Sequence, residues 1–468
     1  MQLFWHRRDL RTRDNAGLAA AARAGTVLPV FVVDDDLLAT LGTRQRAFYL
    51  GCVSRLRARY RDLGSDLVVG VGDPETVLAD LAAERGVERV VYNEHYRPAR
   101  RERARAVREA LASGDVETAS RTDIALVDPG RLTDAYPNHG AFRDDWDAVP
   151  KAEPYPEPDP DALVGSADAP AANAASAELP TASADIDLPE PGYEAARGRL
   201  DRFLDGGIRS YADTRDDLAR AVEAPGVAVS RLSPYLAAGA IGIREVWEAA
   251  GGCLGGASDD GRRNVEKYRD ELTWREQQYH LLYYAPDLAE ENYRTLPNPI
   301  AWREDDAAFE AWTRGETGYP LVDAGMRQLE AEGYVHNRPR QVVASFLTKH
   351  LLIDWRRGAR HFTARLVDHD HATNHGMWQW IASTGTDSVD VRIFDPVSQT
   401  AKYDPDARFV KAYVPELRDV PADEIVDWPT LSADEREELA PEYPEPIVDR
   451  DAAYERAKRV FEEALGKR

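Results

Sequence analysis

The chain has 468 residues, enough for two or three domains, and its 82 acidic and 59 basic residues give a formal net charge of −23. With 43% hydrophobic and 30% charged residues it is predicted to fold, which excludes an intrinsically disordered acidic chain. Only seven of the basic residues are lysines, and this scarcity beside many acids favours adaptation to high salt over a merely acidic proteome. The strongly negative net charge argues against indiscriminate nucleic-acid binding, while leaving room for a local basic groove.

The first third of the chain alternates short apolar runs with helix-like stretches. We predict buried strands at residues 3–5, 27–33, 67–71 and 90–92. We predict helices between them at residues 16–24, 47–63 and 74–85. This alternation indicates a doubly wound parallel α/β domain over residues 1–140.

Two features of this domain are open to plain explanations. Ligands of such sheets usually lie beyond the carboxyl ends of the strands, where Asp34 and residues 70–73 stand, but a tight turn also explains the glycines of that segment. Residues 97–108 hold six arginines against one acid, Glu102. A solvated helix face is the favoured interpretation, with nucleic-acid contact well behind it.

The composition changes twice along the rest of the chain. Residues 150–192 are rich in proline, alanine, serine and acids, so we predict an interdomain linker over residues 141–195 that wraps over the surface or is partly mobile. Helical periodicity then continues to the end, which predicts a large all-α domain over residues 196–468.

The cysteines and the N-terminus limit the cellular setting. Cys52 and Cys253 allow at most one bridge and no zinc finger, which fits a reducing cytoplasm. The first residues lack a signal-peptide pattern, and no apolar run approaches the length of a membrane span. We expect a cytoplasmic protein that does not enter a membrane.

A hydroxyl-rich turn is the first segment that suggests chemistry. Residues 229–236 run Val-Ser-Arg-Leu-Ser-Pro-Tyr-Leu into a predicted helix. Exposed amides and serine hydroxyls at a helix start can hold a phosphate or pyrophosphate. An ordinary helix cap with proline in the first turn explains the same residues, and is the commoner case.

A long helix is predicted over residues 264–284, with Glu271, Trp274 and Gln278 on one face. A carboxylate beside an indole on a buried face is costly unless it has a hydrogen-bonding partner. That arrangement suggests a pocket for a planar polar ligand such as a base. The alternative is a surface glutamate paired with Arg275 or with a neighbouring helix.

Residues 336–341, His-Asn-Arg-Pro-Arg-Gln, precede a predicted apolar helix over residues 342–355. Asn337 can be explained as the N-cap of that helix. Arg338 and Arg340 are harder to explain, because a buried arginine normally meets a carboxylate or a phosphate.

Residues 368–380 combine acids, histidines and tryptophans. His371 and His375 share a helical face and, with His369 and two aspartates, suggest a metal site, the runner-up chemistry. The absence of an HExxH pattern argues against a metal hydrolase, and the flanking tryptophans suit stacking better than metal-bound water. A solvated histidine cluster is the plain alternative.

Taken in order, these segments resemble the DNA photolyase and cryptochrome family over essentially the whole chain. The motifs that carry the resemblance are residues 3–11 with Asp14 and Asn15, and residues 317–324, 344–349, 352–355, 378–380 and 392–396. Each motif is moderately specific, and their order argues against chance.

The resemblance implies an antenna domain, a linker and a helical domain that holds FAD. The flavin phosphates would lie on the hydroxyl turn, the Arg340 and Asp368 pair would flank the ring, and Asn374 would face its N5 atom. The residues implied to bind FAD are Tyr211, Ser230, Leu232, Ser233, Tyr268, Asn337, Arg340, Asp368, Asp370 and Asn374.

By the same resemblance, a cyclobutane pyrimidine dimer flipped out of DNA would enter a cavity beside FAD. Glu271 would hydrogen-bond the dimer and stabilise its radical anion, with Asn337 and Asn374 completing the implied catalytic set. The residues implied to contact DNA are Arg215, Glu271, Trp274, Arg338, Gln341 and Trp380. Trp302, Trp355 and Trp378 match the electron-transfer chain of the family, although three core indoles would explain them too.

The branch of the family follows from two asparagines. Asn337, after His336, is typical of cyclobutane dimer enzymes, and Asn374 stands where plant-type signalling cryptochromes usually carry aspartate. Repair is therefore favoured over the alternative, a blue-light photoreceptor without repair activity. Gln341, Val229 and Tyr268 depart from the usual family residues and bear on affinity.

The implied partner is DNA that contains cyclobutane pyrimidine dimers, and we expect a monomer. The antenna pigment is expected to be 8-hydroxy-5-deazaflavin, with methenyltetrahydrofolate or no pigment as alternatives. Residues 93–98, where the antenna would be held, lack the acids associated with deazaflavin contacts.

Overall fold

A computed structural model describes residues 1–166, 178–386 and 391–467. Its N-terminal part contains a five-stranded parallel sheet in the order β3-β2-β1-β4-β5. The strands are β1 Gln2–His6, β2 Val27–Val33, β3 Val68–Val71, β4 Arg89–Asn93 and β5 Glu117–Arg121. Because the chain leaves the central strand β1 in one direction and returns to add β4 on its other side, the sheet is doubly wound. The predicted fold class is confirmed.

The sequence interpretation missed β5. Its residues Glu117–Arg121 are polar and partly exposed, because β5 pairs with β4 alone at the edge of the sheet. An edge strand needs no continuous apolar run. The four predicted strands are present, each buried over most of its length.

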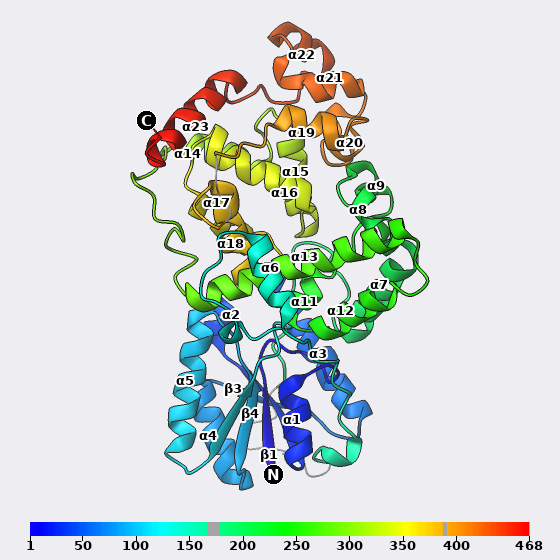
Figure 1. Ribbon diagram of the computed structural model, residues 1–468, viewed down its shortest axis with the longest axis vertical. Coiled ribbons are helices and arrows are strands. Elements are labelled where there is room, and N and C mark those ends of the chain that lie inside the picture. Colours follow the sequence, from blue (N-terminus) through cyan, green and yellow to red (C-terminus); the bar gives the residue numbers. More distant parts are fainter. Residues whose placement is uncertain (167–177, 387–390, 468) are drawn as a thin grey trace.

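Helices cover both faces of the sheet (Figure 1). The helices of this part are α1 Ala16–Ala24, α2 Asp35–Ala39, α3 Thr43–Asp62, α4 Pro74–Arg85 and α5 Pro98–Ala112, and the next helix, α6 His139–Ala148, lies beside α13 Asp259–Tyr284. The arginine run lies on α5, but the prediction of a solvated face is wrong for Arg100, which is 4% exposed. The backbone oxygen of Arg100 accepts a hydrogen bond from the buried Arg7.

The described residues of the C-terminal part form helices joined by loops, with no strand, and this part stacks on the carboxyl ends of the strands (Figure 1). Its helices are α7 Tyr193–Gly206, α8 Tyr211–Thr214, α9 Leu218–Glu223, α10 Pro225–Ala228, α11 Ser233–Ala238, α12 Ile243–Gly252, α13 Asp259–Tyr284, α14 Asp306–Arg314, α15 Pro320–Glu332, α16 Asn337–Ser345, α17 Trp355–Arg365, α18 His371–Ala382, α19 Pro396–Tyr403, α20 Arg408–Tyr413, α21 Ala422–Asp427, α22 Ala433–Leu439 and α23 Arg450–Ala464. Within the ranges described, no helix combines the length and the apolar character that crossing a membrane requires.

The single helix predicted over residues 342–355 is wrong. Helix α16 ends at Ser345, a π-helical turn covers Phe346–His350, and α17 begins at Trp355. The Asp354 side chain caps α17 by accepting from the Arg356 amide, a start signal concealed in an apolar stretch. Asn337 is also not the N-cap: it is the first residue of α16, and the ring of His336 accepts from the Arg338 amide.

The two parts are joined by buried ion pairs after β1. Arg244 of α12 lies 2.6 Å from Asp14 and also pairs with Asp123, which Arg11 of the N-terminal part contacts at 2.6 Å. The predicted boundaries at residues 140 and 195 stay predictions, although α6 begins at His139 and α7 at Tyr193. Residues 167–177 of the predicted linker lie outside the described residues.

Candidate functional site

Two neighbouring cavities in the helical part gather most of the residues implied to bind FAD or to act in catalysis. The larger, of about 240 Å³, is lined by Tyr211, Ser230, Leu232, Ser233, Tyr268, Glu271, Arg340, Asp368, Asp370 and Asn374, among others. The smaller, of about 80 Å³, is lined by Asn337, Arg340, Gln341, Asn374 and Trp378, among others. Because Arg340 and Asn374 line both cavities, the two cavities form one site.

The hydroxyl turn lies at the start of α11. The N-cap of α11 is Leu232, with no side-chain cap bond, so the interpretation of the serines as an ordinary helix cap is wrong. Burial raises the pKa of Tyr268 to about 12, while its hydrogen bond with Ser230 lowers it slightly. Arg231 adopts a left-handed φ of 48° and pairs with Glu332 at 2.7 Å. The two serines of the turn therefore line the larger cavity, whereas the arginine of the turn pairs with Glu332.

Charged groups surround the end of the site that meets the sheet part, which we call the inner end. Arg340 lies 3.4 Å from Asp368, and Arg8 of the sheet part lies 2.6 Å from Asp370, which also accepts a hydrogen bond from Tyr279. Burial raises the pKa of Asp370, but the charges of Arg8 and Arg275 outweigh it and hold that pKa well below its ordinary range. Asp370 is therefore an anion at neutral pH, fixed from both parts of the chain.

Asn374 shows which atom it offers to a ligand. Its amide nitrogen donates to the Ala359 oxygen at 3.1 Å and to the Thr363 hydroxyl at 3.3 Å. The side-chain oxygen is thus the atom left for the cavity that Asn374 lines. An arginine, carboxylates, an amide oxygen and hydroxyls around one cavity make a donor and acceptor set that fits a flavin dinucleotide.

Glu271 lies at the outer end of the site, on α13. It pairs with Arg215, which follows α8, and with Lys267 at 2.7 Å one turn earlier on α13. Of the two alternative partners predicted for Glu271, Arg275 is wrong, because it lies 3.7 Å from Glu276, whereas a partner from a neighbouring helix is present as Arg215. Lys267 was missed by sequence reasoning, although a lysine four residues before a candidate glutamate in a chain with so few lysines was a usable signal.

Of the other residues implied to contact DNA, Gln341 lines the smaller cavity, whereas Trp274, Trp380 and Arg338 line neither cavity. Trp274 and Trp380 meet edge to face, with centroids 6.4 Å apart, and the guanidinium of Arg392 lies 4.2 Å from the Trp380 ring. Arg338 donates to Gln341 at 2.8 Å and to Asp216 at 2.7 Å. Aromatic and cationic groups thus surround the outer end of the site.

The three tryptophans of the predicted electron chain lie in the helical core. Trp355 is fully buried and Trp378 is 4% exposed, while the half-buried Trp302 packs on Phe461. The Trp378 ring meets Trp312 edge to face at 6.2 Å, a neighbour that no motif indicated. The order of electron transfer stays a prediction.

The histidine cluster is compact but does not form a metal site. The rings of His371 and His375 lie 4.4 Å apart, and His375 bonds the His371 oxygen at 2.8 Å. Burial, with a smaller contribution from His375, lowers the pKa of His369 to about 3, so it is neutral. In the three ranges that the structure describes, no group of histidine, cysteine and acidic side chains is arranged to hold a metal ion.

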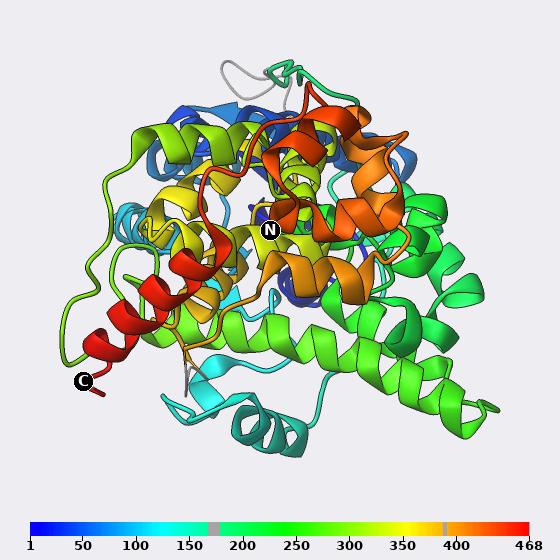
Figure 2. The ribbon, with the colours of Figure 1, turned by 90° about the horizontal axis from the view of Figure 1, so that it is seen from above.

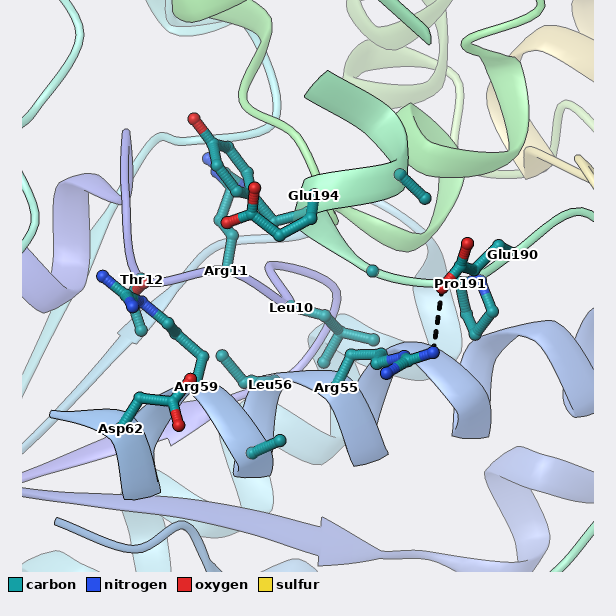
Figure 3. Close-up of a pocket in the computed structure, with 14 residues that line it drawn as sticks. Leu10, Arg11, Thr12, Arg55, Leu56, Arg59, Asp62, Glu190, Pro191 and Glu194 are labelled. Atoms are coloured by element: carbon teal, nitrogen blue, oxygen red, sulfur yellow. Dashed lines mark hydrogen bonds and ion pairs between the residues drawn. The ribbon is translucent and has the colours of Figure 1, made fainter. Parts of the chain in front are cut away.

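A separate cavity of about 210 Å³ lies between α3, the loop after β1 and the start of α7 (Figure 3). Arg55 and Glu190 pair across it at 2.9 Å. Arg59 pairs with Glu157 at 2.5 Å, and Arg11 pairs with Asp123. Because these arginines already meet carboxylates and the cavity shares no residue with the candidate site, we assign it no ligand.

The cleft beside residues 93–98 has little room. It lies between α3 and α11, has a volume of about 20 Å³, and is lined by Arg8, Tyr49 and Arg100, among others. His95 accepts a hydrogen bond from Arg8 at 3.0 Å. A volume of about 20 Å³ holds little more than a single water molecule, so these side chains as placed leave no room for a three-ring pigment.

Comparisons with known proteins agree with this architecture. Residues 2–160 match the DNA photolyase family, and residues 268–463 match the FAD binding domain of DNA photolyase. A deoxyribodipyrimidine photo-lyase of Halobacterium salinarum is 46% identical, with 100% of both chains covered. A cryptochrome DASH of Natronomonas pharaonis is 36% identical over 97% of this chain and 99% of its own. A bacterial class III photolyase structure from Agrobacterium tumefaciens has a TM-score of 0.88 at 35% identity, covering 100% of this chain and 98% of its own. The chain belongs to the DNA photolyase family.

Proposed function

We propose that the chain is a photolyase that repairs cyclobutane pyrimidine dimers in DNA by light-driven electron transfer from reduced FAD. The observation that carries the proposal is that Glu271 lines the same cavity as Asp368 and Asn374. A carboxylate that can hydrogen-bond a base, Glu271, thus lines the same cavity as residues that can hold a flavin. Relatives named deoxyribodipyrimidine photo-lyase support the same activity.

The residues at one end of the site would hold the flavin, and those at the other end would bind the dimer. When bound, reduced FAD supplies the photoexcited electron and takes it back after the cyclobutane ring opens. The side-chain oxygen of Asn374 and the Arg340 and Asp368 pair hold the flavin end of the cavity. Glu271 orients the dimer by hydrogen bonding and steadies its extra charge, and Trp274 and Trp380 offer rings on which a flipped base stacks.

DNA recognition would depend on a few local cations. Arg215 and Arg338 are each held by a carboxylate, Glu271 and Asp216 respectively. Phosphate groups would compete with these carboxylates, so binding requires the arginines to exchange partners. Because few arginines would meet phosphates on a chain whose net charge is −23, few counterions are released, and we expect a weak salt dependence.

A photoreceptor without repair activity is the second candidate. The full-length similarity to a cryptochrome DASH of Natronomonas pharaonis favours it. For the antenna, 8-hydroxy-5-deazaflavin remains our expectation, with methenyltetrahydrofolate or no pigment as alternatives. A pigment in the cleft of Arg8, Tyr49 and Arg100 requires those side chains to move.

The decisive experiment uses the full chain with chemically reduced flavin and an oligothymidylate that contains cyclobutane dimers. Near-ultraviolet or blue light should restore the absorbance of thymine, and the dark control should not. The measurement is repeated from low to molar salt because the composition indicates a saline setting. Absence of light-dependent recovery at every salt concentration would exclude repair and leave the photoreceptor.

A further inference from the structure

The indole of Trp274 is covered on one face by a histidine from outside the helical part. His139, the first residue of α6, stacks on it with ring centroids 3.8 Å apart and planes inclined by 10°. This is the closest ring pair among the described residues. Helix α6 lies beside α13 (Figures 1 and 2), so the stack joins the segment after the sheet to the outer end of the site.

Hydrogen bonds to α13 hold the His139 ring in this position. Its Nδ1 lies 2.8 Å from the side-chain oxygen of Gln277, and its Nε2 lies 3.2 Å from the Thr273 hydroxyl. Gln277 and Thr273 flank Trp274 on the same helix. With only 9% of the residue exposed, the imidazole cannot turn away without leaving both bonds. The ring is therefore a fixed backing for the indole.

Asp270 connects His139 to Glu271. Its carboxylate lies 3.5 Å from His139 Nε2 and 2.8 Å from Lys267 Nζ, and that ammonium also lies 2.7 Å from Glu271. Burial raises the pKa of Asp270, but the hydrogen bonds from His139 and Lys267 and the charge of Arg143 hold it well below its ordinary range. Asp270 thus contacts both His139, which stacks on Trp274, and Lys267, which pairs with Glu271. Trp274 and Glu271 are the side chains that we expect to meet the dimer.

We propose that His139 is a positioning residue for dimer recognition, an inference that rests on the proposed function. It occupies one face of Trp274, so a flipped base can stack only on the other. It also sets the angle of the indole before DNA arrives, and Trp380 limits the motion from the side, 75° from the Trp274 plane. A ring that is already fixed loses little rotamer freedom on binding, which strengthens the stack on the lesion.

The test measures DNA binding in the dark with the flavin oxidised, so that it does not depend on repair. His139→Ala should weaken binding to a single-dimer oligothymidylate about three- to tenfold, the range expected for losing one aromatic pair. Binding to the undamaged strand should not change. His139→Phe, which keeps a flat ring without the two hydrogen bonds, should recover most of the affinity. The control is Asp144→Ala, an exposed position on the same helix, which should behave as the parent.

A second measurement separates positioning from general damage. At saturating DNA and with reduced flavin, His139→Ala should repair each bound dimer as efficiently as the parent. Equal weakening on damaged and undamaged strands, or no recovery in a folded His139→Phe protein, would overturn the inference. If the parent binds dimers selectively but repairs none in light, the proposed function fails, and the dark comparison still decides the role of His139.

Discussion

Removing the carboxylate of Glu271 should separate dimer binding from dimer repair. Glu271→Ala takes away the partner shared by Arg215 and Lys267, whose side chains are 14% and 35% exposed. Partly exposed pairs of this kind contribute up to about 1 kcal/mol each. Without Glu271, Arg215 is free to meet a phosphate, so affinity for undamaged DNA should rise by up to about fivefold at low salt.

Binding to the dimer should change less, because two effects oppose each other. The lost hydrogen bond to the dimer costs about 1 kcal/mol, and the released Arg215 returns a similar amount. Repair should fall more steeply, since the contact matters most once the dimer carries an extra electron. The expected result is a dimer affinity near that of the parent together with a clearly lower repair yield.

The assay titrates fluorescent damaged and undamaged strands in the dark and then measures repair per absorbed photon at saturating DNA. Glu271→Gln is the matched control, because it keeps the size and a hydrogen-bonding group while removing the charge, and it should lie between parent and alanine in repair yield. Parallel losses of dimer affinity and yield, or weaker binding to undamaged DNA, would refute the reasoning.

Three further predictions concern other parts of the molecule. Trp378→Phe should stop light-driven reduction of the oxidised flavin while leaving repair by chemically reduced protein intact; normal photoreduction would remove Trp378 from the chain. Burial lowers the pKa of His350 from 6.5 to about 4. Between pH 6.5 and pH 4 this histidine is therefore protonated in the unfolded chain and neutral in the folded chain. Stability from this group is therefore complete above pH 6.5 and falls by up to about 3 kcal/mol as the pH drops to 4, and His350→Gln should flatten the dependence of Tm on pH. Arg100→Ala should enlarge the cleft beside α3 and increase uptake of added 8-hydroxy-5-deazaflavin, measured by absorption; unchanged uptake would place the antenna elsewhere.

The high negative charge has a clearer meaning beside the structure. Arginines of the site are held by nearby acids, as in the Arg338 and Asp216 pair and the Arg340 and Asp368 pair. Local cations therefore exist within an acidic molecule, but each is neutralised until a ligand competes for it. The charge bears on solubility and salt tolerance more than on the choice of partner.

Local pattern was sufficient for much of the fold. The strands at residues 27–33 and 90–92 and the helix at Pro74–Arg85 are visible because continuous apolar runs and a proline start signal act over a few residues. The edge strand Glu117–Arg121 and the break before Trp355 were not visible. Pairing at a sheet edge and a cap at Asp354 carry no periodic signal.

The sequence by itself determined the architecture and, through ordered motifs such as residues 317–324 and 378–380, the family resemblance and the set of residues to examine. Only the tertiary structure decided that Glu271 shares a cavity with Asn374, that Arg215 compensates its charge, and that His139 packs against Trp274. The contact of His139 with Trp274 joins residues more than a hundred positions apart, and the pair of Arg215 with Glu271 joins residues 56 positions apart. They depend on how α6, α8 and α18 pack on α13, which no local spacing specifies.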